Sequence, residues 1–291
     1  MYTGKENVFR LIPLLTMNTT SYRYPNETLI LTGTLLLVFA VIVLTSTATF
    51  CLSGAFLLLF FGLAYLSVRS HHESLMRHAY RVNPQRMPKL SAVIEEAAKR
   101  LQVEPVEVYV IDSKALNAYT FGIDSPKVIV LTDALLRVLD TEELQFVIGH
   151  EMGHVKLDHT WLNSVIGGLA GIPSPYIGLA ILHLAFRSWN RACEFSADRA
   201  GILANGDPRK AITALIKIGT GGRARTDAEL AQAYAYLDAE DDTLGGNLRE
   251  LVGTHPLIIK RIEQITAYAR SPQYRKLVAK MRVTSSSKPS S

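Results

Sequence analysis

An uncharged stretch of forty residues, 29–68, is the feature that most constrains how this chain can fold. It contains no Asp, Glu, Lys or Arg and consists mostly of Leu, Val, Ile, Phe and Ala. A helix that crosses a bilayer needs about 20 apolar residues, so the stretch is long enough for two. A small polar run at Thr45–Thr49 separates Leu29–Leu44 from Phe50–Val68. The sequence therefore predicts a transmembrane hairpin of two helices, with one long tilted span as the alternative.

The residues that follow this stretch are strongly basic. Glu73 is the one acidic residue among five basic ones: Arg69, Arg77, Arg81, Arg86 and Lys89. Short flanks rich in Lys and Arg stay on the cytoplasmic side of a membrane. We therefore expect the chain after residue 69 to face the cytoplasm. The excess also suits contact with lipid headgroups, and because no nucleic-acid-binding motif accompanies it, we expect no nucleic-acid partner.

The remainder has the pattern of a mixed domain with more helix than strand. Apolar residues at helical spacing predict an amphipathic helix over 90–102. Asp140, with Glu143 three residues later, resembles a capping box that opens a helix reaching about Leu157. The other expected elements are strands at Val106–Ile111 and Lys127–Thr132, and helices at Arg191–Ala204, Arg209–Ile218 and Pro256–Arg270.

The motif His150-Glu-Met-Gly-His154 lies inside the predicted helix that ends near Leu157. A spacing of four places the two imidazoles on one helix face, about 5–6 Å apart at Cβ. Two imidazoles so placed can hold one Zn²⁺, and Glu151 lies beside them, within reach of an activated water. A surface helix with two solvated histidines is the structural alternative. His159 follows this helix beyond ligand reach, so we expect no catalytic role for it.

A catalytic zinc of this kind needs a third protein ligand and an open fourth position. Glu194 offers a carboxylate forty residues after His154, on its own predicted helix. Asp198 is four residues further on the same face, where it could accept the outer N–H of a ligand histidine and fix its tautomer. Alone, this pair is typical of a solvated helix face; beside the histidine motif it predicts a ligand and its support.

At these residues the chain resembles the gluzincins, and more narrowly the HtpX-type membrane metalloproteases, relatives of the CAAX prenyl proteases. The resemblance extends from about Met87 to Arg270. It implies a zincin-like fold with one Zn²⁺ per chain. The roles it implies are zinc ligands at His150, His154 and Glu194, a catalytic base at Glu151 and a supporting carboxylate at Asp198.

Two further segments share the resemblance. Asn117, Ala118 and Tyr119 are similar to the family's Asn-Ala-aromatic segment beside the substrate cleft. Thr254-His255-Pro256, with Arg261 after it, is similar to the family's C-terminal His-Pro stretch. The resemblance implies that His255 donates a hydrogen bond to the oxyanion of the transition state. A histidine that only bonds the backbone at a helix start is the alternative.

The stretch Asn163–Phe186 is apolar: it contains no Asp, Glu, Lys or Arg, and its only histidine is His183. One membrane crossing there would put Glu194 and His150 on opposite sides of the bilayer, and two crossings would need about 40 residues. We expect a short helical hairpin, which either dips into the near leaflet or packs as an ordinary core hairpin.

The sequence thus predicts an α+β, mostly helical protein with a small edge sheet and an active-site helix carrying the HExxH motif. The expected parts are an N-terminal segment (1–28), the transmembrane hairpin (29–68), a basic juxtamembrane linker (69–89), a zinc metallopeptidase domain (90–283, with 163–186 inside it) and a disordered tail (284–291).

The expected function is that of a membrane-anchored, zinc-dependent endopeptidase. The resemblance implies protein or peptide substrates, among them misfolded or damaged membrane proteins, and a bacterial-type inner membrane with the catalytic domain facing the cytoplasm. One alternative is a CAAX-type prenyl-protein endopeptidase. Another is a catalytically idle membrane scaffold with a structural metal, although structural zinc sites normally have four protein ligands and favour cysteine.

Overall fold

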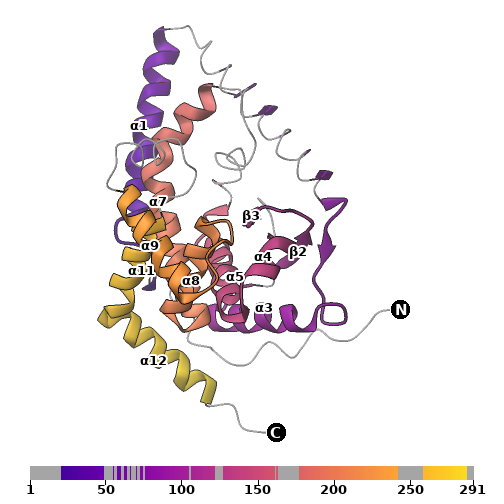
Figure 1. Cartoon of the computed structure of the whole chain (residues 1–291). Helices are drawn as coiled ribbons and strands as arrows, with labels where there is room; N and C mark the ends of the chain where they lie inside the picture. Colours follow the sequence, from indigo (N-terminus) through magenta and orange to yellow (C-terminus); the bar gives the residue numbers. More distant parts are fainter. Residues whose placement is uncertain are drawn as a thin grey trace.

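The computed structural model describes residues 21–48, 76–104, 106–121, 127–160, 162, 177–241 and 258–286, with isolated positions between 55 and 74. Helices predominate around one small sheet, as expected (Figure 1). The helices are α1 (Glu27–Ala48), α3 (Pro88–Leu101), α4 (Asp133–Val138), α5 (Thr141–Lys156), α7 (Ile177–Asn205), α8 (Pro208–Gly219), α9 (Asp227–Asp241), α11 (Ile258–Arg270) and α12 (Pro272–Ser286). The strands are β1 (Tyr80–Arg81), β2 (Glu107–Ile111), β3 (Ala118–Phe121) and β4 (Val128–Thr132).

The sheet has the strand order β1-β2-β4-β3. Strands β2 and β4 are the two expected from the sequence, and they pair in parallel at its centre. Strand β3 pairs antiparallel with β4, and the short β1, which was not expected, pairs antiparallel with β2. Ile129 and Leu131 of β4 are fully buried. Strand β3, with the Asn-Ala-aromatic segment at its start, therefore forms an edge of the sheet.

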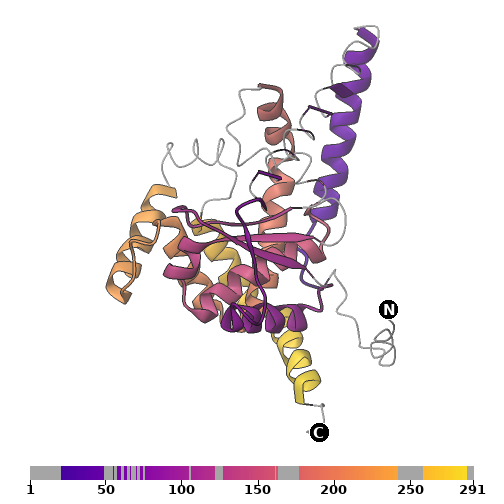
Figure 2. The ribbon, with the colours of Figure 1, turned by 90° about the vertical axis from the view of Figure 1, so that its right-hand side faces the viewer.

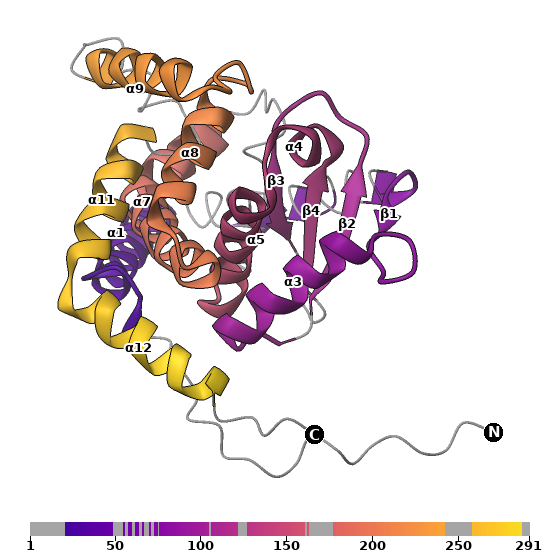
Figure 3. The ribbon, with the colours of Figure 1, turned by 60° about the horizontal axis from the view of Figure 1, so that its bottom comes forward.

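Helix α5 lies between the sheet and the other helices. It contacts α3 and β3 on one side and α7 and α8 on the other, as Figure 3 shows. The capping box expected at its start is confirmed: the Glu143 N–H donates to Asp140 Oδ1, and the Asp140 N–H donates to Glu143 Oε2, each at 2.9 Å. These bonds satisfy backbone donors that a helix start leaves unpaired.

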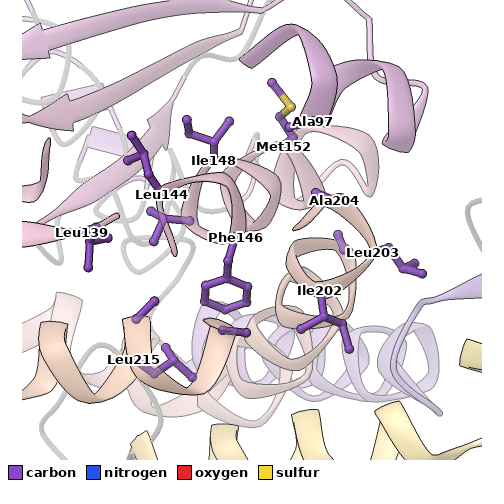
Figure 4. Close-up of a cluster of buried hydrophobic side chains, with 14 of the residues drawn as sticks. Ala97, Leu139, Leu144, Phe146, Ile148, Met152, Ile202, Leu203, Ala204 and Leu215 are labelled. Atoms are coloured by element: carbon purple, nitrogen blue, oxygen red, sulfur yellow. The ribbon is translucent and has the colours of Figure 1, made fainter. Parts of the chain in front are cut away.

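Helices α5 and α7 pack closely because small residues line both contact faces. Figure 4 shows Phe146 of α5 directed toward α7, near Ile202. At Gly149 an added Cβ would lie 2.3 Å from the Ala204 Cβ and 3.2 Å from the Gly201 Cα. A larger residue would force the two backbones apart.

We expect Gly149→Ala to lower the free energy of unfolding by about 1–3 kcal/mol, because the added methyl group overpacks this contact. The measurement is unfolding of the detergent-solubilised protein by urea. Gly33→Ala is the matched control, since a Cβ there meets nothing within 4 Å. Equal losses in the two variants would contradict the importance of this packing.

Helix α7 is longer than the sequence suggested. A helix was expected over Arg191–Ala204; the observed one has 29 residues and also includes residues 177–186 of the expected apolar hairpin. Residues 163–176 lie outside the described residues, so the hairpin itself stays a prediction. The helix ends before Gly206, which has a φ of +78°, as expected from the Asn-Gly pair.

Helix α1 packs against α7 near the body of the protein and then extends beyond it (Figures 1 and 2). Ile30, Leu31 and Val38 of α1 pack beside Phe186 and Trp189 of α7. Most of its other apolar side chains are exposed, including Leu36, Phe39 and Leu44. Among the described residues, this is the one helix with the length and composition to cross a membrane.

The second half of the expected transmembrane hairpin falls mainly on residues outside the described ones. Its isolated described positions, such as Ala55 and Leu58, are helical. Helix α11 matches the stretch expected after Pro256, but α12 was not expected. Helix α12 extends through Ser286 and so includes the first three residues of the expected tail.

Candidate metal centre

Three potential metal ligands meet where α5 and α7 cross. The donor atoms of His150, His154 and Glu194 lie within 4.8 Å of one another, and all three residues are buried. The two Nε2 atoms are 3.2 Å apart. The Glu194 carboxylate approaches them at 3.6 Å from His150 Nε2 and 3.4 Å from His154 Nε2. Both imidazoles therefore direct Nε2 toward the Glu194 carboxylate.

Helix geometry and packing explain this convergence. His150 and His154 are one turn apart on α5, so their side chains lie one above the other. The close crossing at Gly149 and Gly153 brings α7 near enough for Glu194 to reach them: an added Cβ at Gly153 would lie 2.7 Å from the Ala200 Cβ. The small residues of the two helices thus set the distance between the ligands.

Glu151 is buried beside the ligands and is held by the sheet edge. Its Oε2 accepts a hydrogen bond of 2.6 Å from the Thr120 hydroxyl of β3. Sequence reasoning did not identify Thr120, because the contact joins residues 31 positions apart. The bond fixes the carboxylate between the metal-ligand helix and the edge strand.

Asp198 lies behind His150. Its Oδ1 is 3.0 Å from His150 Nδ1, so a proton on Nδ1 can be donated to it while Nε2 faces the other ligands. Arg261 of α11 binds the same carboxylate with two donors: Nε at 2.9 Å from Oδ2 and Nη2 at 2.6 Å from Oδ1. Burial opposes ionisation of Asp198, but the Arg261 guanidinium and His150 outweigh it and lower the pKa of Asp198.

We expect Asp198→Asn to weaken zinc binding roughly 10–100-fold without abolishing it, as is typical when a residue that orients a metal ligand is changed. The three ligands would remain, but Arg261 would lose the carboxylate to which it donates two hydrogen bonds. Competition with a chelator of known affinity measures the effect. An affinity equal to that of the wild type would contradict a role for Asp198 in the site.

His159 contacts the other ligand histidine. Its Nδ1 is 3.0 Å from His154 Nδ1, although the sequence suggested no role for it. The end of α5 causes this contact. The His159 N–H donates to the His154 carbonyl, and the Asp158 N–H donates to the Val155 carbonyl. Asp158 has a φ of +59°. These bonds form a Schellman motif, which folds the chain back over the last turn. Burial lowers the pKa of His159 to about 4, so the ring is neutral.

The remaining expected site residues are only partly placed. Ala118 and Tyr119 lie half-buried in β3, and burial raises the pKa of Tyr119 to about 12. The Asn117 side chain is exposed, while its backbone N–H and carbonyl bond the Thr132 hydroxyl at 3.1 and 3.0 Å. His255 lies outside the described residues, so its role stays a prediction.

The donor set suits zinc. Two imidazole nitrogens and one carboxylate are the ligands of a known class of catalytic zinc site, in which a fourth position is left for water or substrate. The Nδ1 atom of each histidine also has a hydrogen-bonding partner, Asp198 for His150 and His159 for His154. Histidines that bind a metal almost always have such a partner.

Two relatives by sequence are a metallopeptidase and a protease by name. The chain is 33% identical over 211 residues to the plastoglobule-localized metallopeptidase 48 of Arabidopsis thaliana chloroplasts, a match that covers 68% of this chain and 61% of that protein. It is 29% identical over 229 residues to a protease HtpX homolog of Burkholderia cenocepacia, covering 68% and 80%. The crystal structure of S. mikatae Ste24p aligns with a TM-score of 0.44 at 19% identity, over 72% of this chain and 56% of that one.

The family itself is also matched directly. Residues 84–269, which include His150, Glu151, His154 and Glu194, match Peptidase family M48. The expected resemblance to HtpX-type metalloproteases is confirmed by the named relatives. The chain therefore belongs to peptidase family M48 and is a metalloprotease by family.

Proposed function

We propose that this chain is a membrane-anchored zinc endopeptidase whose catalytic site lies close to the bilayer. The observation that carries the proposal is the convergence of His150, His154 and Glu194, with Glu151 held beside them. When bound there, Zn²⁺ supplies Lewis acidity that polarises the scissile carbonyl and acidifies the attacking water. Glu151 takes the proton of that water and returns it to the leaving amine.

The edge strand suits an extended peptide substrate. Strand β3 pairs with β4 along one side, and no other described strand pairs with its second side. A peptide can add to such an edge through main-chain hydrogen bonds. Because Thr120 of β3 also holds Glu151, a peptide on this edge would lie beside the base. The segment Asn117, Ala118 and Tyr119 would then contact the substrate.

The position of α1 supports the proposed membrane topology. The residues before α1 pack on the catalytic domain: the Tyr24 N–H bonds the Ser196 hydroxyl at 2.7 Å, and Tyr22 is fully buried. If α1 crosses the bilayer away from this contact, the chain must cross back before β1, as the segment Phe50–Val68 would allow. The basic residues that follow favour a cytoplasmic catalytic domain, in a bacterial-type inner membrane.

Misfolded or damaged membrane proteins are the substrates that the HtpX-like relatives suggest. A CAAX-type endopeptidase that acts on prenylated C-termini is the second candidate, because it uses the same zinc chemistry. We favour protein quality control, because 68% of this chain aligns with a protease HtpX homolog of Burkholderia cenocepacia.

For His255 we propose the role of an oxyanion donor, which lowers the barrier through a hydrogen bond formed in the transition state. The next residue is Pro256, whose ring fixes its own φ angle and so restricts the backbone beside His255. His255→Ala should lower kcat roughly 10²–10³-fold with KM nearly unchanged. A variant with the wild-type kcat would contradict this role.

The proposed activity is tested with the full chain in detergent. Casein should be cleaved by the zinc-loaded protein, spared after chelation and cleaved again when Zn²⁺ is returned. Cleavage that survives complete metal removal would contradict the proposal. Cleavage of farnesylated C-terminal peptides with casein left intact would favour the CAAX-type candidate.

A further inference from the structure

We propose that His159 and Glu27 are positioning residues that fix the proton and orientation of the metal ligand His154, and so join the metal centre to the first turn of α1. This inference rests on the proposed zinc site. It adds two residues far from the HExxH motif to the machinery that holds the metal.

The contacts form a continuous buried chain. His154 Nδ1 lies 3.0 Å from His159 Nδ1, and His159 Nε2 lies 3.0 Å from Glu27 Oε1. All three residues are buried. The carboxylate is itself held, because Arg23 and Ser196 both donate to Glu27. Each nitrogen of His159 therefore faces a specific partner.

The positions of the protons follow from metal binding. A neutral imidazole carries one N–H and one lone pair, and His154 must offer the lone pair of Nε2 to the metal. Its proton is then on Nδ1, which donates to His159 Nδ1. His159 consequently carries its own proton on Nε2, which donates to Glu27. With these protons, each contact has one donor and one acceptor.

The alternative interpretation is that Glu27 and His159 form a second metal site together with Cys193. Glu27, His159 and Cys193 also place ligand atoms within 4.8 Å of one another. A metal on His159 Nε2 would leave the proton of this ring on Nδ1, facing the Nδ1–H of His154. Two donors would then meet at 3.0 Å, so neutral His154 and His159 cannot both bind a metal. The cluster therefore serves the first site.

The arrangement also ties the metal centre to the start of α1. Arg23 donates from Nη2 to the Leu157 carbonyl at 3.1 Å, at the end of the helix that carries His154. Arg199 of α7 donates to the Arg23 carbonyl at 3.0 Å. A displacement of α1 would thus move the acceptor of His159.

The test compares two amides in place of His159, with zinc affinity measured by chelator competition on the full chain in detergent. Asn can put its carbonyl oxygen near the position of Nδ1 and accept from His154, whereas Gln reaches toward Glu27 and leaves His154 without that acceptor. We expect the Asn variant to keep an affinity near the wild-type value and the Gln variant to lose roughly 10–100-fold. Equal affinities for the two variants would overturn the role of His159.

Two further variants complete the experiment. Glu27→Gln keeps an acceptor and should bind zinc nearly as the wild type does, whereas Glu27→Leu should bind it roughly 10-fold more weakly. Equal affinities for this pair would overturn the role of Glu27. Cys193→Ala should keep one zinc per chain; a fall from two to one would reveal the second metal site and overturn the inference. If the wild-type protein itself bound no zinc, the proposed function would fail instead.

Discussion

Replacement of Glu151 by Gln is expected to lower peptidase activity by several orders of magnitude while zinc stays bound. The amide cannot take a proton from the attacking water, so general-base catalysis is lost. The three ligand side chains are unchanged, and the Thr120 hydroxyl still has an oxygen to which it can donate. The measurements are kcat/KM on casein and zinc per chain by elemental analysis.

The matched control is Glu142→Gln, nine residues earlier on α5. This carboxylate is exposed and meets only Lys210, at 3.8 Å, among the ion pairs of the described residues. We expect its activity to equal that of the wild type. Normal cleavage by Glu151→Gln with full zinc occupancy would show that Glu151 is not the base.

Glu194→Ala is expected to remove zinc altogether. Two imidazoles remain on α5, and α7 then contributes no donor to the site. The loss should exceed the 10–100-fold effect expected for an outer-sphere partner such as Asp198. Arg261, whose Nη1 lies 3.5 Å from Glu194 Oε2, would remain beside the vacated position and add positive charge that repels a cation.

Cys193→Ala is the control for this variant. Cys193 precedes Glu194 on α7 but packs with Phe186 and Trp189 on another face, so its removal leaves the zinc ligands intact. We expect one zinc per chain in the control and none in Glu194→Ala after dialysis. Full zinc occupancy in Glu194→Ala would move the third ligand elsewhere. The nearby Asp158 is a poor substitute, since its side chain is exposed.

Local patterns were enough to predict the elements that carry the ligands. The capping box at Asp140, the amphipathic helix after residue 90 and the two central strands depend on residues a few positions apart, and all were confirmed. The spacing of His150 and His154 likewise identifies a shared helix face without knowledge of the fold.

Contacts between distant segments could not be predicted in the same way. Thr120 reaches Glu151, Arg261 reaches Asp198, and Glu27 reaches His159 across 132 positions. Such pairs depend on how the helices pack, which no short pattern encodes. His159 does carry a local signal, because a Schellman motif returns the second residue after the helix C-cap to the last turn.

Zinc K-edge X-ray absorption of the purified full chain identifies the atoms that bind the metal. We expect one zinc per chain with only nitrogen and oxygen neighbours at about 2.0–2.2 Å, as for coordination by His150, His154, Glu194 and a water. A sulfur neighbour at about 2.3 Å would instead place the metal on a cysteine and contradict binding by His150, His154 and Glu194.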